Sequence, residues 1–486
     1  MRRLISLAIP LFICSHFSGC AAAAAVPVTL TIRTGIPAMQ IPQGFSGLSF
    51  ETGSLHYNNH NYKRHAYFFD PTNTGLLTLF RNLGIKTIRL GGNSVDRGYV
   101  PSFRAINTFF RFVKAAHVKV IYSLRLANGS ARQDAMIARY IWRRYRRYLV
   151  CLAIGNEPNS YNDLDPEITD VSSYITKWKR FSKAVTRAAP GVKIGGPDSG
   201  NGATKWASAF ARAERGSVNV RDILCHYEPG GTSRRKSARQ FISLMLSPAW
   251  DVRNYFTCYR RIGAMALSHG FAYRFTECNS FVATPFTHGD NHSFATALWA
   301  LDFMHWWAEH QCRGVNFHTG LIGFNSAIYV DRLNGYAVYP EGYGVAAFHL
   351  GGCGRADPLT IDNPEHLDLT AYAVTARDGT LCMTVINKSS GRDAHQAAVR
   401  IEASGTNASV VYLSAPDNNA AATSGITLGG SAVNGDGPWL GRWKPLKPRG
   451  TAGCVLVVPA TSAAIVKLAK AKIGPDSGRK IDFQNK

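Results

Sequence analysis

The sequence predicts an α/β fold, in which a (β/α)8 TIM barrel is followed by an appended C-terminal antiparallel β-sandwich. Eight short apolar runs alternate with segments of helical period between residues 45 and 354, which is typical of a (β/α)8 barrel. After residue 355, β-type runs follow one another with Gly, Asn, Asp and Pro between them, as in a sandwich. No glycine-rich phosphate loop follows the first strand, which disfavours a doubly wound open sheet.

The barrel strands are predicted from their apolar content and from the turn residues that end several of them. They are expected at 45–51, 87–93, 119–125, 150–157, 193–197, 222–227, 273–279 and 314–319. The segments between them have helical periodicity. In 138–149, for example, Ile141 and Tyr145 share an apolar face and Arg139 and Arg143 lie on another. A barrel of this kind carries its active site at the carboxyl ends of the strands.

The sandwich strands are expected at 367–375, 381–387, 397–402, 410–414, 454–459 and 463–468. Leu369 and Ala371 alternate with Thr370 and Tyr372, the pattern of a strand with one buried face. Val28, Leu30 and Ile32 alternate in the same way, so we expect this early strand to join the sandwich. The expected organisation is a leader over 1–25, an N-terminal strand segment over 26–44, a barrel over 45–354 and a sandwich with a polar tail over 355–486.

The first residues have the pattern of a secretory signal peptide. Arg2 and Arg3 precede a short apolar run, and small residues follow it. The stretch that ends at Cys20 resembles a bacterial lipobox, so lipidation of Cys20 and plain cleavage within 21–25 are both open. We expect an exported chain, either periplasmic, secreted or lipid-anchored at the cell envelope. A lipid on Cys20 would be its only membrane attachment, because no later run has about 18 consecutive apolar residues.

The chain is strongly basic, with 55 Lys and Arg against 31 Asp and Glu among 486 residues, a net charge of +24. Such an excess favours an anionic partner, either an acidic polysaccharide or an anionic surface. The basic loop that includes Arg234 and Arg239 is either such a site or a solvated loop. No recognised nucleic-acid module is present, so we expect no nucleic-acid partner. The ten cysteines form no Cys-x-x-Cys pair, and neither a metal nor another cofactor is implied.

Two glutamates lie at the ends of predicted strands. Glu157 follows Asn156 at the end of the fourth strand, and Glu277 ends the seventh. Pro158 favours an extended backbone at Glu157. Strands four and seven face each other across the barrel mouth, so the two carboxyl groups can flank one substrate bond. A protonated acid opposite an anionic carboxylate is the arrangement that glycoside hydrolysis requires.

These motifs resemble those of known enzymes. Asn156-Glu157-Pro158 together with Glu277 resembles the clan of retaining glycosidases whose catalytic pair lies on strands four and seven. Three further segments resemble glycoside hydrolase family 79, the β-glucuronidase and heparanase family. They are Gly-Phe-Ser-Gly-Leu-Ser-Phe-Glu at 44–51, Ile-Arg-Leu-Gly-Gly-Asn-Ser at 88–94 and Glu-Cys-Asn-Ser at 277–280. The resemblance covers the barrel and the sandwich.

The resemblance implies a retaining β-glycosidase, most simply a β-glucuronidase, that acts on an oligosaccharide, polysaccharide or other glycoside. Glu157 would be the acid/base and Glu277 the nucleophile. Their carboxyl groups would then lie about 5–5.5 Å apart, and the reaction would pass through a covalent glycosyl-enzyme intermediate. Arg89 would either support the nucleophile electrostatically or form a structural ion pair.

The resemblance also implies a set of sugar-binding residues. Asn156 would hydrogen-bond the sugar 2-hydroxyl, and Tyr227 would donate to Glu277. Glu51 and Asn93 would bind the far hydroxyls of the same sugar. Tyr343 is the aromatic residue nearest to the place of a family tyrosine that binds the sugar carboxylate.

The sequence departs from the family where a glucuronate would be held. Val282 and Thr284 stand at the positions of a clamping Tyr and Gly, and Gly342 stands where a second Tyr is usual. His318, Tyr343 and Arg234 remain as substitutes for this clamp. A β-glucuronide and a neutral or modified β-glycoside therefore both stay open as substrates, as do exo and endo attack.

A different class of function is a non-catalytic carbohydrate-binding surface protein built on a degenerate barrel. Retention of Glu157 and Glu277 together with Asn156 and Tyr227 argues against this degeneration. Cleavage of chromogenic glycosides distinguishes the two classes.

Overall fold

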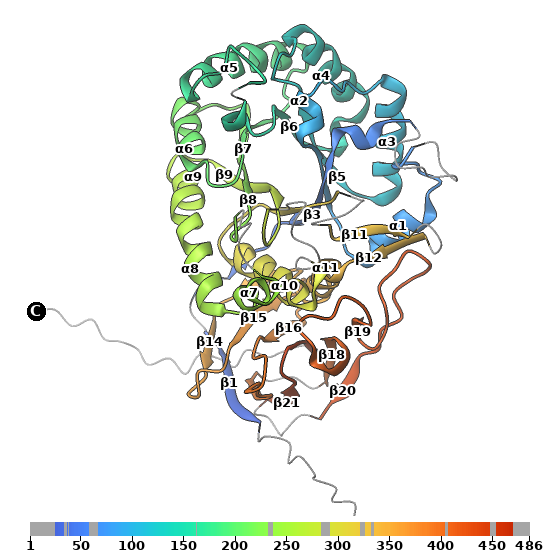
Figure 1. Ribbon diagram of the computed structural model, residues 1–486, viewed down its shortest axis with the longest axis vertical. Coiled ribbons are helices and arrows are strands. Elements are labelled where there is room, and N and C mark those ends of the chain that lie inside the picture. Colours follow the sequence, from blue (N-terminus) through green and yellow to red (C-terminus); the bar gives the residue numbers. More distant parts are fainter. Residues whose placement is uncertain are drawn as a thin grey trace, which may run out of the picture.

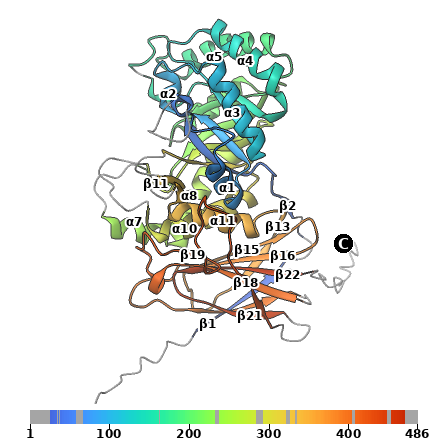
Figure 2. The ribbon, with the colours of Figure 1, turned by 90° about the vertical axis from the view of Figure 1, so that its right-hand side faces the viewer.

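The computed structural model describes residues 25–33, 36, 38–57, 67–161, 163–231, 237–282, 292–320, 326–331, 335–403, 407–447 and 453–469. The expected leader with Cys20, most of the basic loop with Arg234, and the tail from 470 lie outside these residues. A barrel ringed by helices stands above a sheet-rich part (Figure 1). The view turned by 90° shows helices α10 (Phe294–Glu309) and α11 (Pro340–Gly351) between the two (Figure 2).

The barrel is closed and has eight strands, as predicted. The strands are β3 (Ser46–Glu51), β4 (Thr87–Gly91), β5 (Lys119–Leu124), β6 (Leu149–Ile154), β7 (Ile194–Ser199), β8 (Val220–Tyr227), β9 (Ala272–Cys278) and β10 (Val315–His318). Each pairs in parallel with its neighbours, and β10 pairs with both β9 and β3. Because all strands run in one direction, their carboxyl ends meet at one mouth.

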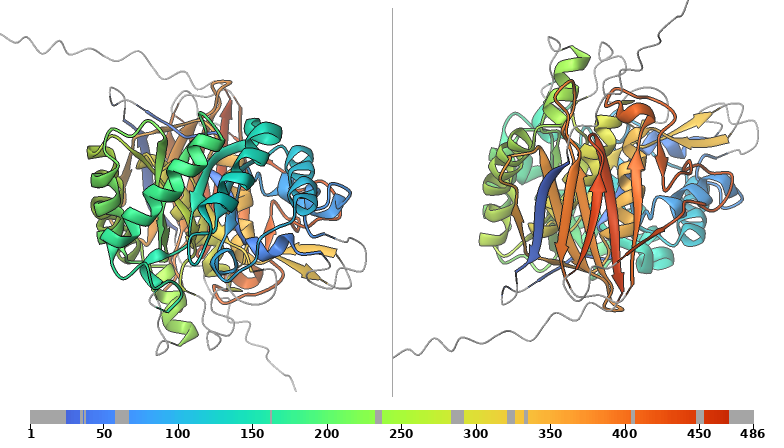
Figure 3. Two further views of the ribbon diagram at one scale, coloured as in Figure 1. Left: turned by 90° about the horizontal axis from the view of Figure 1, so that it is seen from above. Right: turned by 90° about the horizontal axis from the view of Figure 1, so that it is seen from below.

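Helices surround the barrel, as Figure 3 shows from above. They are α1 (Thr74–Asn82), α2 (Asn93–Asp96), α3 (Phe103–Ala116), α4 (Ala131–Tyr145), α5 (Val171–Ala188), α6 (Thr204–Ala213), α7 (Ala238–Met245), α8 (Pro248–Cys258) and α9 (Ala264–Ser268). Helix α3 begins after Ser102, whose side chain accepts from the Ala105 N–H as an N-cap. It buries Phe109 and Phe112 toward the barrel.

Helices α10 and α11 pack against each other and are buried on nearly all sides. A helix that is apolar all round is a core element rather than a surface one. Helix α11 also contacts β22 (Ser462–Ala469) and β16 (Leu381–Asn387) of the sheet-rich part. The hairpin β11 (Ile328–Asp331) and β12 (Gly335–Val338) precedes α11. These helices therefore join the two halves of the molecule.

The C-terminal part contains two sheets. One has the order β14-β1-β17-β21, formed by β14 (Leu359–Asp362), β1 (Val26–Ile32), β17 (Ala397–Glu402) and β21 (Cys454–Val458). The other has the order β19-β18-β22-β16-β15-β13-β2 with β20 paired to β18. Its remaining strands are β2 (Met39–Gln40), β13 (Arg355–Asp357), β15 (Leu369–Thr375), β18 (Asn407–Ser414), β19 (Thr427–Leu428) and β20 (Lys444–Leu446).

A second core, which includes Leu30, Met383 and Val399, fills the space between these sheets. Strand β1 lies between β14 and β17 and pairs in parallel with β17. The right panel of Figure 3 shows β1 in blue beside orange strands from the other end of the chain. The first described strand is thus an interior strand of the C-terminal sheet.

A buried ion cluster also crosses between the two parts. Lys388, which follows β16, pairs with Asp251 of α8 and lies 3.0 Å from Asp302 of α10. Tyr372 donates a hydrogen bond of 2.7 Å to Asp302. The positive charge of Lys388 is therefore compensated by both barrel carboxylates, and the sandwich is fixed to the barrel by charge as well as by apolar packing.

Within the described residues, no helix combines the length and apolar character needed to cross a bilayer. The eight cysteines from Cys151 to Cys454 are all unpaired thiols.

Candidate active site

A buried arginine organises the barrel mouth. The Arg89 side chain, on β4, points into the barrel and is fully buried. Its Nη1 lies 2.8 Å from Glu277 Oε2, and its Nη2 lies 2.6 Å from Asp198 Oδ2. Nη2 also donates to Asn156 Oδ1 at 2.6 Å. Arg89 therefore forms one ion pair with Glu277 and another with Asp198, and its support of a nucleophile stays a prediction.

Glu277 lies at the end of β9 with 18% of its side chain exposed. His318 Nδ1 lies 3.1 Å from Glu277 Oε1, at ion-pair distance but without alignment for a hydrogen bond. Burial by itself would raise the pKa of Glu277, but His318, His226 and Arg89 hold this pKa well below its usual range. Glu277 is therefore an anion, as a nucleophilic carboxylate must be.

Glu157 follows β6 and reaches toward the mouth with 30% of its side chain exposed. The expected extended backbone is wrong, since Glu157 has φ 48° and ψ 54°, the left-handed region that non-glycine residues seldom adopt. Its N–H donates to the Asp198 carbonyl at 2.9 Å, and its own carbonyl accepts from Ser160 at 2.8 Å. These two bonds at the strand-to-turn junction offset the preference set by Pro158.

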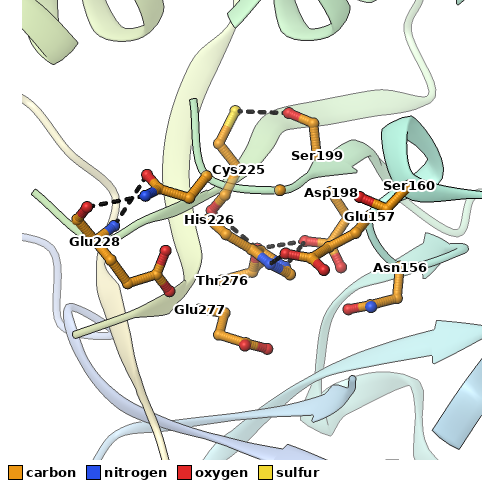
Figure 4. Close-up of polar contacts among 12 residues, drawn as sticks. Asn156, Glu157, Ser160, Asp198, Ser199, Cys225, His226, Glu228, Thr276 and Glu277 are labelled. Atoms are coloured by element: carbon orange, nitrogen blue, oxygen red, sulfur yellow. Dashed lines mark hydrogen bonds and ion pairs between the residues drawn. The ribbon is translucent and has the colours of Figure 1, made fainter. Parts of the chain in front are cut away.

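Three residues of this network, His226, Asp198 and Thr276, had no assigned role in the sequence prediction. His226 Nδ1 of β8 lies 2.9 Å from Glu157 Oε1. Its Nε2 lies 3.5 Å from Asp198 Oδ1. Thr276 donates to the same Asp198 oxygen. Figure 4 shows His226 between Glu157 and Asp198. The sequence signal for them was position alone, because all three lie near the ends of barrel strands.

The charge state of His226 follows from these neighbours. Burial by itself lowers the pKa of His226, but Glu277, Asp198 and Glu157 together raise it well above its usual value. Burial likewise opposes the Asp198 anion, and Arg89 and His226 nevertheless lower the pKa of Asp198. The mouth therefore contains alternating positive and negative groups that stabilise one another.

Tyr227 does not have the expected contact with Glu277. Its ring packs against Phe275, Phe303 and Trp307 at centroid distances of 5.3 to 6.2 Å, on the side of the strand that faces α10. Successive side chains of a strand point to opposite faces, and His226 takes the inward position. Among the described residues, Arg89 and His318 contact Glu277 instead.

Three other predicted residues lie near the mouth. Asn156 is buried, and its N–H donates to Asp96 at 2.9 Å. The Glu51 carboxylate accepts from the N–H groups of Asn93 and Ser94 at 3.1 and 2.8 Å, so it caps the short helix α2. The Asn93 side chain is exposed. Glu51 therefore fixes the loop that presents Asn93, and contact of either with a sugar stays a prediction.

Tyr343 forms no hydrogen bond with either glutamate within the described part of the chain. It is in α11, and its hydroxyl accepts from the Val433 N–H at 3.4 Å, in the segment after β19. At Gly342, a Cβ would lie 2.4 Å from the Ala327 carbonyl oxygen, so a tyrosine does not fit there without a backbone shift. Val282 follows β9 and donates its N–H to the Gly231 carbonyl. Thr284 lies outside the described residues.

Two further carboxyl groups lie close to this network. Glu228, one residue beyond β8, is buried, and burial followed by the charge of Glu277 raises its pKa to about 8. Glu341, in the first turn of α11, is buried as well, and burial raises its pKa to about 8 despite His318. Its Oε1 has no hydrogen-bond partner among the described residues. At neutral pH both are largely protonated and able to donate hydrogen bonds.

The site is thus built from protein carboxyl, imidazole and guanidinium groups. Among the described residues, no group of three or more His, Cys, Asp or Glu side chains is arranged to hold a metal ion. Glu277 is anionic, and Glu157 lies beside His226, a proton-bearing group. An anionic carboxylate and a proton-bearing imidazole are therefore both present at the mouth.

Comparison with known proteins shows similarity in fold. No protein-family model matches the chain, and no curated protein sequence does. A 4-O-α-L-rhamnosyl-β-D-glucuronidase from Fusarium oxysporum 12S superposes with a TM-score of 0.70 at 16% identity, over 90% of this chain and all of that one. A GH51 arabinofuranosidase from Xanthomonas axonopodis pv. citri has a TM-score of 0.66 at 16% identity, over 91% of this chain and all of that one.

An α-L-arabinofuranosidase from Thermotoga maritima, solved with arabinose, has a TM-score of 0.65 at 12% identity over 91% of this chain and all of that one. The chain therefore has the barrel-plus-β-domain fold of glycoside hydrolases.

Proposed function

We propose that this protein is a retaining glycosidase in which Glu277 is the nucleophile and Glu157 the acid/base. One observation carries the proposal. Glu277 is held as an anion by Arg89 and His318, while Glu157, at the end of another strand, contacts His226 at the same barrel mouth. One carboxylate fixed as an anion, with a second carboxyl group at another strand end of the same mouth, is the arrangement that a nucleophile and an acid/base require.

The proposed reaction has two displacements. Glu277 attacks the anomeric carbon as Glu157 transfers its proton to the leaving oxygen, and a glycosyl ester forms. A water then gives its proton to Glu157 and attacks the same carbon, which releases the sugar and restores the Glu277 carboxylate. His226 Nδ1, 2.9 Å from Glu157 Oε1, is a proton-bearing group in contact with the acid.

We propose a β-glucuronide as the first substrate candidate. The motifs at 44–51, 88–94 and 277–280 support it, and so does the similarity in fold to a rhamnosyl-β-glucuronidase. Protonated Glu228 or Glu341, or cationic His318, would replace the missing tyrosine clamp as hydrogen-bond donors to the sugar carboxylate. We further propose that the enzyme is exported, on the pattern of residues 1–25.

A neutral β-glycoside is the second candidate, and a specific observation favours it. A tyrosine at position 342 is excluded by the Ala327 carbonyl, and the nearby carboxyl groups Glu228 and Glu341 would repel a uronate at high pH. Arabinofuranosidases among the proteins of similar fold also keep a neutral sugar open.

The test is a panel of chromogenic β-glucuronide, β-glucoside, β-galactoside, β-xyloside and α-L-arabinofuranoside. We expect cleavage of at least one by the wild type and retention of anomeric configuration in the first-formed sugar by NMR. Glu277→Gln should lower kcat on the order of 10⁴–10⁶-fold, and Glu157→Gln about 10²–10⁴-fold. The exposed Glu365→Gln is the matched control.

Inverted product would contradict the double displacement. Full activity in both variants would contradict the residue assignment. Binding of a glycan without any cleavage would favour the non-catalytic carbohydrate-binding protein.

A further inference from the structure

A second polar pocket lies at the opposite end of the barrel. It has a volume of about 380 Å³ and is lined by residues at or just before the starts of barrel strands, among them Gly44, Thr87 and Val150. In a (β/α)8 barrel this amino-terminal face is the one remote from the catalytic mouth. Its lining is therefore independent of Glu157 and Glu277.

The charge of this lining is of one sign. It contains six side chains able to carry a positive charge and no Asp or Glu; they are Lys86, His117, Lys119, Arg221, Arg274 and Arg313. These six residues lie at the starts of five strands, β4, β5, β8, β9 and β10, or in the loops just before them. The closed barrel therefore brings them together. Cations that converge on a hollow of this kind attract and retain an anion.

Arg274 is the buried base of the pocket, with 3% of its surface exposed. Its guanidinium donates only to neutral acceptors, among them the carbonyls of Gly44 at 2.9 Å and Arg313 at 2.7 Å. Its Nε makes no hydrogen bond among the described residues. A buried cationic donor without a partner is costly unless a ligand satisfies it.

One buried carboxylate, Asp222, lies near this base. Its Oδ2 is 3.2 Å from Arg221 Nε, and its Oδ1 has no hydrogen-bond partner among the described residues. A single carboxylate does not balance the surrounding cations. Within the described part of the chain, neither Lys86 nor Arg313 forms an ion pair, and both are exposed at the rim.

The pocket adjoins a hollow of about 600 Å³ between barrel and sandwich. The two share Pro42, Gln43 and Lys86, and the second adds one cation, Arg377, and one acid, Asp378. Space thus extends beyond one anionic group, while the positive charge is concentrated in the first pocket. This continuity gives room for a larger molecule that carries the anionic group.

We propose that the amino-terminal pocket of the barrel is a binding site for a multiply charged oxyanion of the phosphate or sulfate type, held by Lys86, Arg274 and Arg313. Planar guanidinium groups and an ammonium provide charge-assisted hydrogen bonds suited to such oxyanions. The group can be a free anion or a substituent on a polysaccharide, and the site binds it through the same contacts.

The test is calorimetric titration of the full chain with pyrophosphate, dextran sulfate and neutral dextran at constant ionic strength. We expect pyrophosphate to bind and Lys86→Ala/Arg313→Ala to weaken it about ten-fold or more, as loss of two charge-assisted bonds implies. The control Arg104→Ala/Arg132→Ala removes two exposed charges at the starts of α3 and α4 and should leave this affinity unchanged.

The outcomes distinguish a free anion from a polysaccharide substituent, and a defined site from diffuse surface charge. Binding of both pyrophosphate and dextran sulfate supports the site with a polysaccharide substituent as one source, while pyrophosphate alone indicates a free anion. Equal weakening by the two double variants would show diffuse surface charge and overturn the proposal, as would binding of neither anion. Glu277→Gln should not alter the titration, so loss of catalysis and loss of this site are distinguishable.

Discussion

The two ends of the barrel each bury one arginine, and they treat it in opposite ways. Arg89, toward the carboxyl-terminal mouth, is flanked by Asp198 and Glu277. Arg274, at the amino-terminal end, is surrounded by carbonyl and amide oxygens. Burial lowers the pKa of both, but Asp198 and Glu277 raise that of Arg89 above its usual value, whereas the pKa of Arg274 stays lowered.

The difference shows how one scaffold serves two electrostatic purposes. At the mouth, the positive charge of Arg89 is compensated by carboxylates of the protein, and it holds Glu277 as an anion. At the other end no carboxylate accepts a hydrogen bond from Arg274, and neither Lys86 nor Arg313 forms an ion pair among the described residues, so this positive charge can attract an external anion. Four experiments test this contrast between the two ends of the barrel.

The largest effect is expected for Arg89→Met. The change leaves Asp198 and Glu277 buried without their cation, which typically costs about 3–5 kcal/mol. Urea unfolding at pH 7 measures the loss. Addition of Asp198→Asn should restore part of it, because one uncompensated charge is removed. A loss below about 1 kcal/mol, the range of exposed pairs, would show that the ion pairs do not organise the mouth.

The second largest effect is expected on the pH dependence of the unfolding free energy, through Glu341. Its pKa is raised to about 8, above the usual value near 4.3, so the folded chain holds this proton while the unfolded chain has lost it. Stability from this group is complete below the unfolded pKa and falls as pH rises toward 8, by up to about 1.4 kcal/mol per pH unit.

Urea unfolding of the wild type from pH 5 to pH 7.5 should show this decline, and Glu341→Gln should make it shallower. Glu365→Gln, an exposed change, should follow the wild type. A steeper decline in the Glu341 variant would contradict the assigned protonation.

The third effect is that of Arg274→Met. It removes a buried cation but leaves the carbonyls of Gly44 and Arg313 without their donor, for which we expect a loss of about 1–3 kcal/mol. Unfolding in parallel with Arg89→Met measures the difference between the two ends. An equal or larger cost at Arg274 would contradict the contrast drawn above.

The smallest effect on stability is expected for Lys86→Ala/Arg313→Ala. Both side chains are exposed and lack ion pairs within the described residues, so unfolding free energy should change by no more than about 0.5 kcal/mol per substitution. Thermal unfolding with and without pyrophosphate checks this. Without the anion the two proteins should melt together, and a given concentration of the anion should stabilise the wild type more than the variant.

Much of the fold follows from local sequence patterns. All eight barrel strands were predicted within a few residues, because each is a short apolar run followed by a helix of clear period. The positions of Glu157 and Glu277 at strand ends follow from the same pattern. What the pattern does not contain is the direction of a side chain at a distorted strand end.

Tyr227 and His226 illustrate that limit. Alternation along β8 turns His226 inward and Tyr227 outward, and the pairing with β9, which shifts between Cys225 and His226, sets His226 opposite Glu277. Glu157 illustrates another limit, because its left-handed backbone depends on hydrogen bonds to Asp198 and Ser160, which are distant or formed only in the turn. Tyr343 depends on the packing of α11 against the sandwich. Tertiary contacts set all three.

Strand β1 has a consequence for the order in which the chain folds. It is synthesised before the barrel, yet its two partners, β14 and β17, follow the barrel in the chain. The barrel is therefore an insertion within the sandwich, and every contact of β1 closes a loop of more than three hundred residues. Until synthesis reaches β14 this apolar strand has no partner strand, and until it reaches β17 one edge stays open, so a newly made chain exposes its first strand to wrong pairing.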